Sequence, residues 1–597
     1  MYTVDTETAA IDNRPVYPPR PVGVAIRYPD GTSCYFAHGH PTNNNSTWEE
    51  ARTELAAIWE SGEEILFQNA SFDLEVIKNG YDLPLPDWRR VHDTMFTLYL
   101  YNPHAKTLSL KPSAEQILGW KPEEQDKLKD WVTANVPGIN KKKNPWGANI
   151  DKSPGDLCGE YAIGDVDRTF ALYVETRAYL ERNSMIEAYD RERELMFMLL
   201  HSEMTGMRVD MENLQADIET YQALFTKVEQ EIFTILGVGE FNINSSAALV
   251  DVVRAQGMSV EPWETTDKGR LRTARDVLER HIRHPKLAGL LGYRGALKTA
   301  LGTFMQPWEL LASSNNGRLH THWHQVRNPN GFGTRTGRIS SSAPNFTNVP
   351  NEYAPPPEGY LHPPYCRQYL LPEEGHGWLK RDYSAQEIRI LAHFEDGQLM
   401  RTFNEDPYMD PHTTASKLIL EQTGINLPRS HTKQTAFSIV YGAGIKSMAA
   451  ALNCSFQEAD STKSAYYKTF PGILQLQSAV KARGARGDAV RTLGGRLIFS
   501  EPAIGHQRFD YKLLNHLIQG SAGDVTKEGL IAYHKEKKDG IFLAQVYDEV
   551  NVSVPLDCME SESEILRQCM EERSVKMDVP LKTDEYIGTN WYDVEKG

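Results

Sequence analysis

Cysteine and long apolar runs are scarce in this 597-residue sequence. Its six cysteines are scattered, without a CxxC pair or a partnering histidine nearby, which argues against a disulfide framework or a zinc site and indicates a reducing compartment. No stretch of about 18 or more apolar residues occurs, so no membrane-spanning segment is predicted. The N-terminus lacks the basic and apolar regions of a secretory signal. We therefore expect a cytoplasmic protein without a membrane partner.

Basic residues are outnumbered: 64 Lys and Arg against 80 Asp and Glu give a formal net charge of −16. Proteins that bind nucleic acid are usually basic, but clefts and local patches focus the field of a large chain, so this class is not excluded. With 40% hydrophobic and 24% charged residues the composition is that of a globular protein, not of a disordered chain, collagen or coiled coil. At roughly 100–200 residues per domain, the length predicts three to five domains.

Strand-like and helical runs change in proportion along the chain. Residues 1–185 alternate between the two, which predicts an α/β domain. Residues 186–310 are mainly helical, and from residue 311 onward helices and strands mix. The basic run at 140–144 interrupts the first region. We interpret it as a solvated loop, with a single-strand contact as the alternative.

Three acidic segments of the first region lie beside elements that read as buried. Asp5 and Glu7, two residues apart on a predicted strand, project from the same face. Asp73 ends the segment NASFD after an apolar run, and Asp165 ends YAIGD, which is predicted to open a helix. Alone, D-x-E fits an exposed strand edge equally well. Together, these carboxylates suit a pair of Mg²⁺ or Mn²⁺ ions that could activate a water and stabilise the leaving oxygen of a phosphodiester.

In this order, D-x-E, N-x-x-x-F-D and Y-x-x-x-D resemble the three motifs of the DEDD 3′–5′ exonucleases, in the subtype with tyrosine. The resemblance covers most of residues 1–185 and implies an RNase H-like fold. The metal ligands that it implies are Asp5, Glu7, Asp73 and Asp165, and Tyr161 would orient the attacking water. Asp93 also fits the family pattern, but we favour a helix N-cap for it.

Two further acidic segments are predicted at the ends of strands. A strand is predicted to end at Asp382 and a helix to follow, which places a carboxylate beside N–H groups that attract phosphate. A plain helix cap explains that single residue as well. Asp548 and Glu549 interrupt the apolar run 541–554, and acids rarely lie inside a strand pair unless they are at a turn or bind something. A hairpin tip there would present Asp548 towards Asp382.

Between these two segments, a pattern repeats every four residues. Arg429, Lys433, Phe437 and Tyr441 fall near one face of a predicted helix over a length of about 18 Å. Two cations followed by two aromatics suit the phosphates, sugar and base of a nucleoside triphosphate. The alternative is an amphipathic helix that buries its aromatic side chains.

These three segments resemble motifs A, B and C of the family A DNA polymerases, the family of bacterial DNA polymerase I and phage replicases. Supporting similarity lies at 336–350, 494–496 and 515–520. The resemblance implies a multidomain α/β plus α+β fold, with an RNase H-like exonuclease domain followed by a right-hand polymerase. The implied domains are the exonuclease (1–185), the helical thumb (186–310), the first part of the palm (311–411), the fingers (412–500) and the second part of the palm (501–597).

The resemblance also implies a role for each motif residue. Asp382, Asp548 and the carbonyl of Tyr383 would bind two Mg²⁺ ions, with Mn²⁺ as a substitute, and Glu549 would support them. The residues that would contact the dNTP are Arg429, Lys433, Phe437, Tyr441, His412, Glu387 and Gln386. Among them, Lys433 would donate a proton to pyrophosphate, and Glu387 and Tyr441 would exclude a ribose 2′-hydroxyl. The residues that would contact primer–template DNA are Arg338, Asn345, Asn515, Gln519 and Tyr547.

Some positions depart from the family pattern. Residues 385–386 are Ala-Gln where Gln-Ile is usual, and Tyr547 replaces a usual histidine. Thr347 and Tyr511 replace a frequent glutamine and a frequent arginine. Base preference and primer contacts at these positions therefore stay open. Phe437 goes with discrimination against dideoxynucleotides in this family, which Phe437→Tyr is expected to relieve.

We interpret the sequence as a proofreading DNA polymerase that adds dNTPs to a primer 3′ end. Because Asp5 lies near the start, we expect no 5′-nuclease domain, which favours a monomeric phage-type replicase in the host cytoplasm. Its expected partners are primer–template DNA, dNTPs and replisome proteins such as a helicase–primase and a single-strand-binding protein. The alternatives are a host-type repair polymerase and an exonuclease or nucleic-acid-binding protein with an impaired polymerase half. A related single-subunit RNA polymerase is disfavoured by Glu387, because an enzyme that accepts ribose needs that space.

Overall fold

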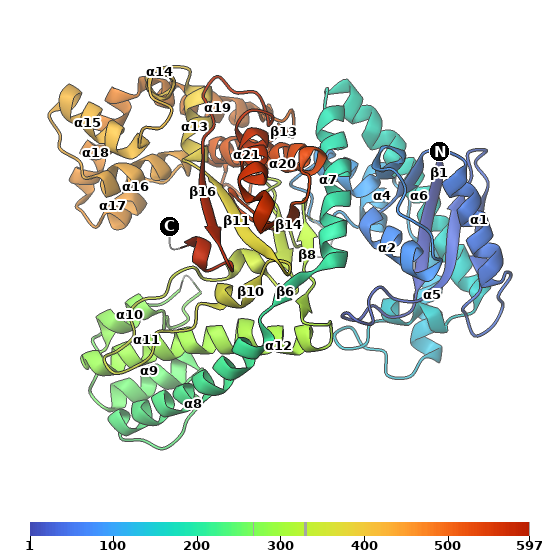
Figure 1. Cartoon of the computed structure of the whole chain (residues 1–597), viewed down its shortest axis with the longest axis horizontal. Coiled ribbons are helices and arrows are strands. Elements are labelled where there is room, and N and C mark those ends of the chain that lie inside the picture. The colour runs from blue at the N-terminus through green and yellow to red at the C-terminus, as the bar shows by residue number, and fades with distance from the viewer. Residues whose placement is uncertain (267, 328–330, 596–597) are drawn as a thin grey trace.

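A five-stranded sheet organises the N-terminal region of the computed structural model, which describes residues 1–266, 268–327 and 331–595 (Figure 1). Its strands are β1 (Tyr2–Thr8), β2 (Pro21–Arg27), β3 (Ser33–Ala37), β4 (Ile65–Phe67) and β5 (Val91–Asp93), in the spatial order β3-β2-β1-β4-β5. β2 runs antiparallel to both of its neighbours, whereas β1, β4 and β5 are parallel. This order, with its second strand reversed, agrees with the RNase H-like fold that the sequence predicts.

Six helices accompany this sheet: α1 (Trp48–Glu60), α2 (Ala70–Gly80), α3 (Thr94–Tyr101), α4 (Leu110–Leu118), α5 (Glu123–Asn135) and α6 (Gly155–Arg182). α1 begins with a capping box, in which the side chains of Thr47 and Glu50 each accept a backbone N–H of the other residue. α6 begins six residues before Tyr161, so the segment 161–165 lies inside the helix and does not open it, contrary to our prediction. The basic run at 140–144 forms an exposed turn, as the solvated-loop interpretation requires.

Asp93 joins two helix N-termini. Its carboxylate accepts the N–H of Met95 at 2.7 Å, which caps α3 and confirms the predicted cap. The same carboxylate accepts the N–H groups of Asn69 and Ala70, at 3.0 and 2.8 Å, at the start of α2. One buried acid therefore fixes the entry to the helix that carries Asp73.

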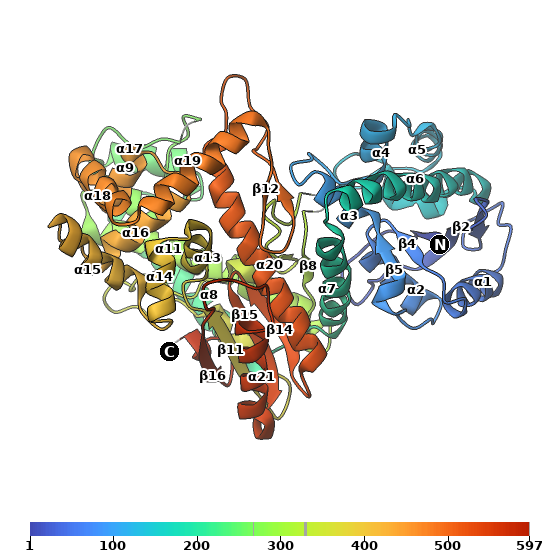
Figure 2. The ribbon, with the colours of Figure 1, turned by 90° about the horizontal axis from the view of Figure 1, so that it is seen from above.

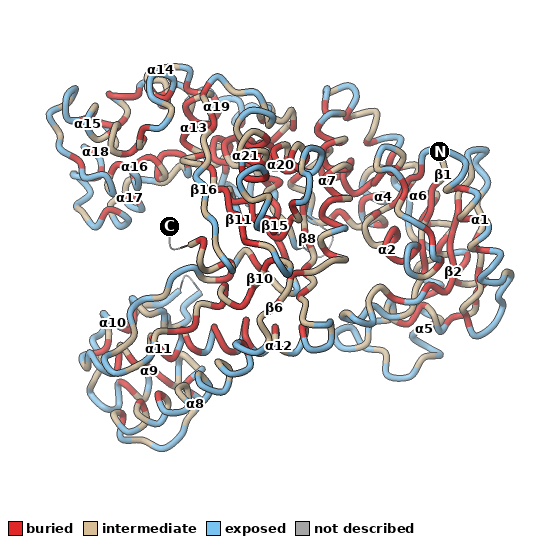
Figure 3. Tube along the Cα trace, in the orientation of Figure 1, coloured by how far each residue is buried: buried red, intermediate tan, exposed pale blue. Residues whose placement is uncertain are grey.

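A second, antiparallel sheet lies at the centre of the remaining chain. Its strands, in spatial order, are β14 (Ile541–Val546), β15 (Glu549–Pro555), β11 (His376–Tyr383) and β16 (Thr583–Gly588). α20 (Leu513–Glu536) and α21 (Met559–Glu571) pack against it, and Figure 2 shows α20 crossing the strands. The stacked rings of Trp378 and Trp591 are fully buried in this core. Figure 3 shows that buried residues follow the strands of both large sheets.

Two helical groups project from the second sheet to the same side (Figure 1). One has its own apolar core and contains α8 (Met211–Leu236), α9 (Ser246–Ala255), α10 (Arg275–His281) and α11 (Pro285–Thr299). The other contains α13 (Gln386–Glu395), α14 (Gln398–Glu405), α15 (Pro411–Thr423), α16 (Arg429–Val440), α17 (Ile445–Leu452), α18 (Phe456–Thr469) and α19 (Pro471–Arg486). These groups lie mainly within the segments predicted as thumb and fingers, although α13 and α14 precede residue 412 and share the core of the second group.

Short elements connect these parts. They are α12 (Gln306–Ser313), the three-stranded sheet of β6 (Met207–Val209), β7 (Arg318–Leu319) and β10 (Leu370–Leu371), and the pairs β8 (His322–His324) with β9 (Ser340–Ser342) and β12 (Val490–Arg491) with β13 (Leu497–Ile498). Over the described ranges, no helix combines the length and the apolar character needed to cross a bilayer.

α7 (Ile186–Thr205) belongs to neither helical group. Its Tyr189, Met196 and Leu200 pack into the core of the first sheet, whereas Leu195 and Met198 pack into the core of the second. The sequence leads us to place the start of the thumb at residue 186. In the structure α7 lies between the two sheets instead, and the separate helical core is built from α8 onward. The reason is that α7 carries apolar side chains for two different cores, which a helical period alone does not distinguish.

Candidate active sites

Three of the predicted exonuclease acids meet at the central strand of the first sheet. β1 carries Asp5 and Glu7, and α6, which packs against β1, carries Asp165. One oxygen of each of these three carboxylates lies within 4.8 Å of the others. Oxygen ligands at this spacing can surround a single divalent cation. The strand therefore supplies two acids and the helix one.

Asp73 lies beside this group of three rather than within it. Its Oδ1 accepts the backbone N–H of Thr6 at 2.9 Å and the Thr6 hydroxyl at 2.6 Å. Thr6, which separates the two acids of β1, thus orients the Asp73 carboxylate and engages one of its oxygens. The sequence predicts four equivalent ligands, but the structure brings three together and holds the fourth through a threonine.

Burial makes these acids difficult to ionise. Burial, followed by the charge of Asp165, raises the pKa of Glu7 to about 8. Burial also raises the pKa of Asp73 to about 7, and burial with the charge of Asp73 raises the pKa of Asp5. In addition, Oδ1 of Asp165 is buried and makes no hydrogen bond to any residue that the structure describes. Desolvated carboxylates with a spare oxygen fit a hard cation such as Mg²⁺ or Mn²⁺.

Lys111, at the start of α4, is a residue of this site that the sequence analysis missed. Its side chain is nearly buried, and its Nζ lies 2.5 Å from Oδ2 of Asp165. The same Nζ lies 3.9 Å from the ring centre of Tyr161, which stands one turn before Asp165 on α6. Lys111 thus contacts both an acid of the group and the tyrosine predicted to orient water. It is 54 residues away from Asp165, and no local pattern marks it.

The residues predicted to bind the dNTP surround one cavity of about 630 Å³, between the α13–α16 region and the second sheet. The predicted residues that line it are Arg338, Asp382, Tyr383, Gln386, Glu387, His412, Arg429, Lys433, Phe437, Tyr441, Tyr547 and Asp548. A concave site of this size suits a small-molecule ligand. Gln386 also contacts α20, where its side-chain amide donates to the Thr526 hydroxyl at 3.0 Å.

Asp382 and Asp548 come together at the floor of this cavity. Asp382 lies near the end of β11, and Asp548 lies in the turn between β14 and β15, where Tyr547 has a φ of 55°. The N–H of Tyr383 donates to the carbonyl of Asp548 at 3.2 Å and ties the turn to β11. The predicted hairpin tip is therefore confirmed. Tyr547 adopts the left-handed conformation that is uncommon for a non-glycine residue.

The two aspartates form a second desolvated acid group. Burial, followed by the charges of Asp548 and Glu549, raises the pKa of Asp382 to about 8. Burial also raises the pKa of Asp548. Oδ1 of Asp382 is buried without a hydrogen bond to a described residue, so this site too offers a free hard oxygen that fits a divalent cation.

Glu549 lies behind the cavity rather than in it. Its Oε1 accepts the side-chain N–H groups of Asn551 at 2.8 Å and Trp591 at 3.2 Å. Arg367 and Lys380 each lie 3.9 Å from its carboxylate. These two cations were missed, although Lys380 could have been found, since it precedes Asp382 by two residues on β11 and shares its face.

The stripe on α16 is turned towards the cavity. Tyr441, which ends the helix, is 45% exposed, and Arg429 and Lys433 are also exposed. The alternative of a helix that buries its aromatic side chains is therefore wrong for Tyr441. Arg429 is not free, because its guanidinium pairs with Asp410 at 2.5 Å. The His412 ring lies 6.1 Å from that of Phe437, and burial lowers the pKa of His412 to about 4.

Four of the five residues predicted to contact DNA are divided between two cavities, with Arg338 and Tyr547 in the first. Arg338 lines the first and pairs with Glu387 at 2.6 Å. Asn515 and Gln519, on α20, line a second cavity of about 590 Å³, and Tyr441 lines both cavities. Gln519 donates to the Tyr441 hydroxyl at 3.2 Å. Asn345 does not appear among the described residues that line either cavity, and its Oδ1 accepts the Thr347 hydroxyl at 2.6 Å.

Comparison with known families assigns both parts of this arrangement to a family. Residues 211–593 match the model of "DNA polymerase family A". The chain belongs to DNA polymerase family A. Residues 2–181 match the model of a "3′-5′ exonuclease" domain, which includes every acid of the first group. The exonuclease match and the polymerase match leave α7, which joins the two cores, between them.

Curated relatives within family A include DNA polymerase I of Chloroflexus aurantiacus, 28% identical over 96% of this chain and 59% of the relative. DNA polymerase I of Streptococcus pneumoniae is 31% identical over 71% of this chain and 49% of the relative. The chain thus spans about half to three fifths of the length of these relatives. A solved structure with a similar fold is the POL domain of Pol1 from M. smegmatis, with a TM-score of 0.78, 20% identity and coverage of 99% and 95% of the two chains.

Proposed function

We propose that this family A chain is a template-directed DNA polymerase that extends a primer 3′ end with dNTPs and removes mispaired ends by 3′–5′ hydrolysis. The observation that carries the proposal is the meeting of Asp382 and Asp548 in a cavity whose α16 side exposes Arg429 and Lys433. A separate group of acids lies at another sheet, and its neighbouring cation, Lys111, is nearly buried and paired with Asp165. One centre suits synthesis, and the other suits hydrolysis.

Both acid groups fit divalent cations, for which we propose Mg²⁺ with Mn²⁺ as a substitute. Bound there, such ions would lower the pKa of the attacking hydroxyl or water and stabilise the leaving oxygen. In the polymerase centre, Asp382, Asp548 and the carbonyl of Tyr383 would hold them. In the exonuclease centre, the ligands would be Asp5, Glu7, Asp165 and the remaining oxygen of Asp73.

The chain's own groups would position the substrates. Arg429, once released from Asp410, and Lys433 would bind the triphosphate, and Phe437 would pack against sugar and base. Glu387 and Tyr441 would fill the space of a ribose 2′-hydroxyl. In the exonuclease centre, Tyr161 would orient the attacking water while Lys111 holds its ring.

Primer–template DNA is the proposed macromolecular substrate. The M. smegmatis POL domain of similar fold was solved in complex with DNA primer-template and dNTP. Arg338 and Tyr547 line the first cavity, and Asn515 and Gln519 line the second. There they would read the shape of the primer end rather than its sequence. Asn345 would contact the same duplex from the loop before Phe346, outside the two cavities.

The place of this enzyme in the cell stays a prediction. Our prediction remains a phage-type replicase in the host cytoplasm, working as a monomer with a helicase–primase and a single-strand-binding protein. The relatives described above are DNA polymerases I of bacteria. The alternative for this chain is a host-type repair polymerase.

The proposal is tested by primer extension and mismatch removal on the wild type, Asp548→Ala and Asp5→Ala. Asp548→Ala is expected to reduce synthesis by about 10³-fold or more while mismatched ends are still removed, since a metal ligand is worth several kcal/mol in the transition state. Asp5→Ala is expected to do the reverse.

Exposed acids provide matched controls for these two variants. Asp557→Ala on the palm side and Glu49→Ala on α1 are expected to leave both activities unchanged. If either active-site change removed both activities in a folded protein, the assignment of two separate centres would be wrong.

A further inference from the structure

A tyrosine of the exonuclease core reaches into the polymerase half of the chain. Tyr99, on α3, is 1% exposed and packs in the core of the first sheet. Its hydroxyl donates to the carbonyl of Arg335 at 3.0 Å and accepts a hydrogen bond from Nη1 of Arg496 at 2.9 Å. Both partners lie more than 200 residues further along the chain, on the polymerase side. A single hydroxyl therefore joins the two halves.

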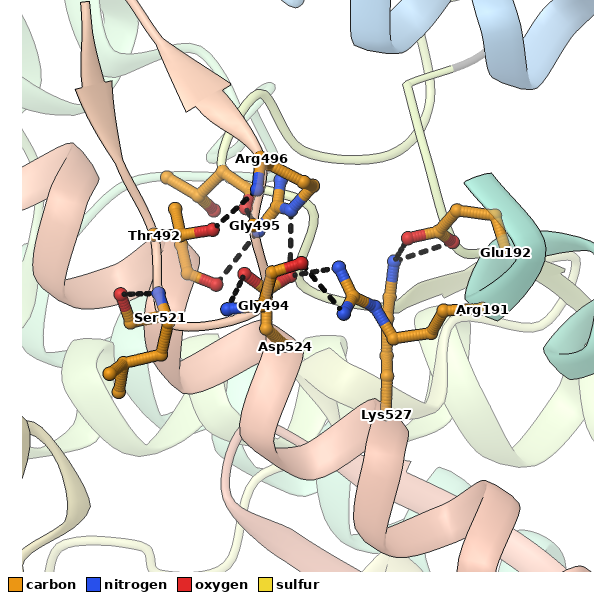
Figure 4. Close-up of polar contacts among 12 residues, drawn as sticks. Arg191, Glu192, Thr492, Gly494, Gly495, Arg496, Ser521, Asp524 and Lys527 are labelled. Carbon is orange, nitrogen blue, oxygen red and sulfur yellow. Dashed lines mark hydrogen bonds and ion pairs between the residues drawn. The ribbon is translucent and has the colours of Figure 1, made fainter. Parts of the chain in front are cut away.

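Arg496 is the hub of this contact. It is 2% exposed, and Figure 4 shows it beside Asp524 of α20, whose Oδ1 accepts from Nε at 2.6 Å. Its Nη2 donates to the carbonyls of Thr336, at 2.8 Å, and Gly520, at 2.7 Å. The guanidinium thus uses its fixed fork to hold two polymerase segments, the loop at Thr336 and the helix α20, and one exonuclease side chain at once.

The loop that Arg496 holds leads directly to the polymerase cavity. Gly337 has a φ of 84°, and a Cβ built there would lie 2.5 Å from Nη1 of Arg496 and 2.9 Å from the Tyr99 hydroxyl. The backbone therefore passes close over this pair, with no room for a side chain. The next residue is Arg338, which lines the cavity and pairs with Glu387. Within two residues, the chain runs from the exonuclease contact to the groups proposed to hold the primer end.

A second buried pair fixes the same two halves nearby. Lys527 of α20 donates to Glu192 of α7 at 2.7 and 2.8 Å, and Arg191 pairs with Asp524 at 3.1 Å (Figure 4). All four side chains are buried. These contacts hold α7 to α20, but none of them touches the loop that carries Arg338. The two sets of contacts share the Asp524 carboxylate, whose Oδ1 accepts hydrogen bonds from Arg191 and from Arg496. Tyr99 and Arg496, in contrast, hydrogen-bond to the loop itself.

We propose that Tyr99 and Arg496 are positioning residues for the polymerase site, through which the exonuclease domain sets the place of Arg338. Because Arg338 is proposed to hold the primer end, the Tyr99 hydroxyl biases that end towards extension and away from excision. This inference rests on the proposed function, and it adds that an exonuclease residue outside both active centres controls the partition between them.

The test uses Tyr99→Phe, which keeps the ring in the core and removes only the hydroxyl. The matched control is Tyr81→Phe, a fully buried tyrosine of the same core whose hydroxyl contacts His38 at 2.8 Å inside the exonuclease half. The measurement is the ratio of primer ends excised to primer ends extended at a fixed dNTP concentration. Degradation of single-stranded DNA and the melting midpoint are recorded for each variant.

Tyr99→Phe is expected to raise the ratio of excision to extension by about 3- to 10-fold, the effect of a typical hydrogen bond, with an unchanged rate on single-stranded DNA. Tyr81→Phe is expected to leave the ratio at the wild-type value. An unchanged ratio in Tyr99→Phe, or an equal change in both variants, would overturn the proposal.

Arg496→Lys provides the second measurement, because it keeps a cation beside Asp524 and loses the fork. It is expected to shift the ratio in the same direction, and the double variant is expected to show no further shift, since the two residues act on one loop. Effects that multiply would overturn the proposal. If Arg496→Lys does not fold, Tyr99→Phe decides alone. A wild type that neither extends nor excises contradicts the proposed function, whereas an active wild type with an indifferent Tyr99→Phe contradicts only this inference.

Discussion

The two acid groups of this chain balance their charge in different ways. In the exonuclease group a nearly buried cation, Lys111, contacts Asp165 directly. In the polymerase group two arginines of the cavity are held by other acids of the cavity, Arg429 by Asp410 and Arg338 by Glu387. Under the proposed function, a triphosphate and a primer end would therefore displace existing ion pairs in the second centre.

This difference matches the demands of the two reactions. Hydrolysis of a strand end requires the same geometry whatever the base, so a preformed and internally balanced site suffices. Synthesis must distinguish a correct dNTP from an incorrect one, and a site whose contacts exchange on binding can make assembly depend on the substrate. We infer that the exonuclease centre is rigid and that the polymerase centre is completed by its substrates.

The largest effect is expected when Lys111, the cation that contacts the exonuclease group, is replaced. Lys111→Met is expected to reduce degradation of a mismatched primer end by about 10- to 100-fold, because the side chain holds a proposed metal ligand and the Tyr161 ring. Primer extension is expected to stay unchanged. Lys127→Met, which removes an exposed lysine of α5, is the control. Equal degradation by both variants would show that Lys111 does not serve the site.

A smaller effect is expected from the ion pair of the polymerase group. Asp410→Asn keeps an N-cap for α15, because asparagine caps as well as aspartate, but releases Arg429. The KM for dNTP is expected to fall by up to about fivefold, the free energy of a partly exposed ion pair, with little change in kcat. Steady-state extension kinetics measure this effect, with the exposed Glu405→Gln as the control. A raised KM would mean that the pair supports the site rather than restrains it.

The smallest effect concerns stability and applies to both groups. Folding raises the pKa values of Glu7 and Asp382 to about 8. Between about pH 6 and 8.5 the folded chain therefore binds more protons than the unfolded chain. With a chelator present, the free energy of unfolding should therefore fall as the pH rises from about 6 to 8.5. Mg²⁺ should stabilise more at the upper pH. Melting midpoints of the wild type and of Glu7→Gln, for which a shallower slope is expected, check this; identical slopes would contradict it.

Much of the geometry of the two acid groups could be predicted because it lies in short patterns. D-x-E on β1 and the four-residue steps of α16 encode geometry locally, since the period of a strand or helix fixes which side chains share a face. The hairpin tip at Asp548 followed from two acids in an apolar run. In each of these three cases the structure has the local geometry that the pattern predicts.

What could not be predicted are contacts between distant segments. Lys111 and Tyr99 belong to ordinary-looking helices, and their roles depend on Asp165 and Arg496, which only the tertiary fold brings near. The hydrogen bond between the Thr6 hydroxyl and the Asp73 carboxylate is also a contact between distant segments that the sequence does not reveal. The packing of α7 against two cores was missed, because the sequence does not show which of its apolar residues belongs to which core.

That shared helix has a consequence for dissecting the molecule. A fragment that ends at residue 185 would lack Tyr189, Met196 and Leu200, which pack against the first sheet. The apolar surface that these side chains cover would then be exposed to solvent. A self-sufficient nuclease fragment would have to keep the helix through Thr205, and its second apolar face would then need polar replacements at Leu195 and Met198 to remain in solution.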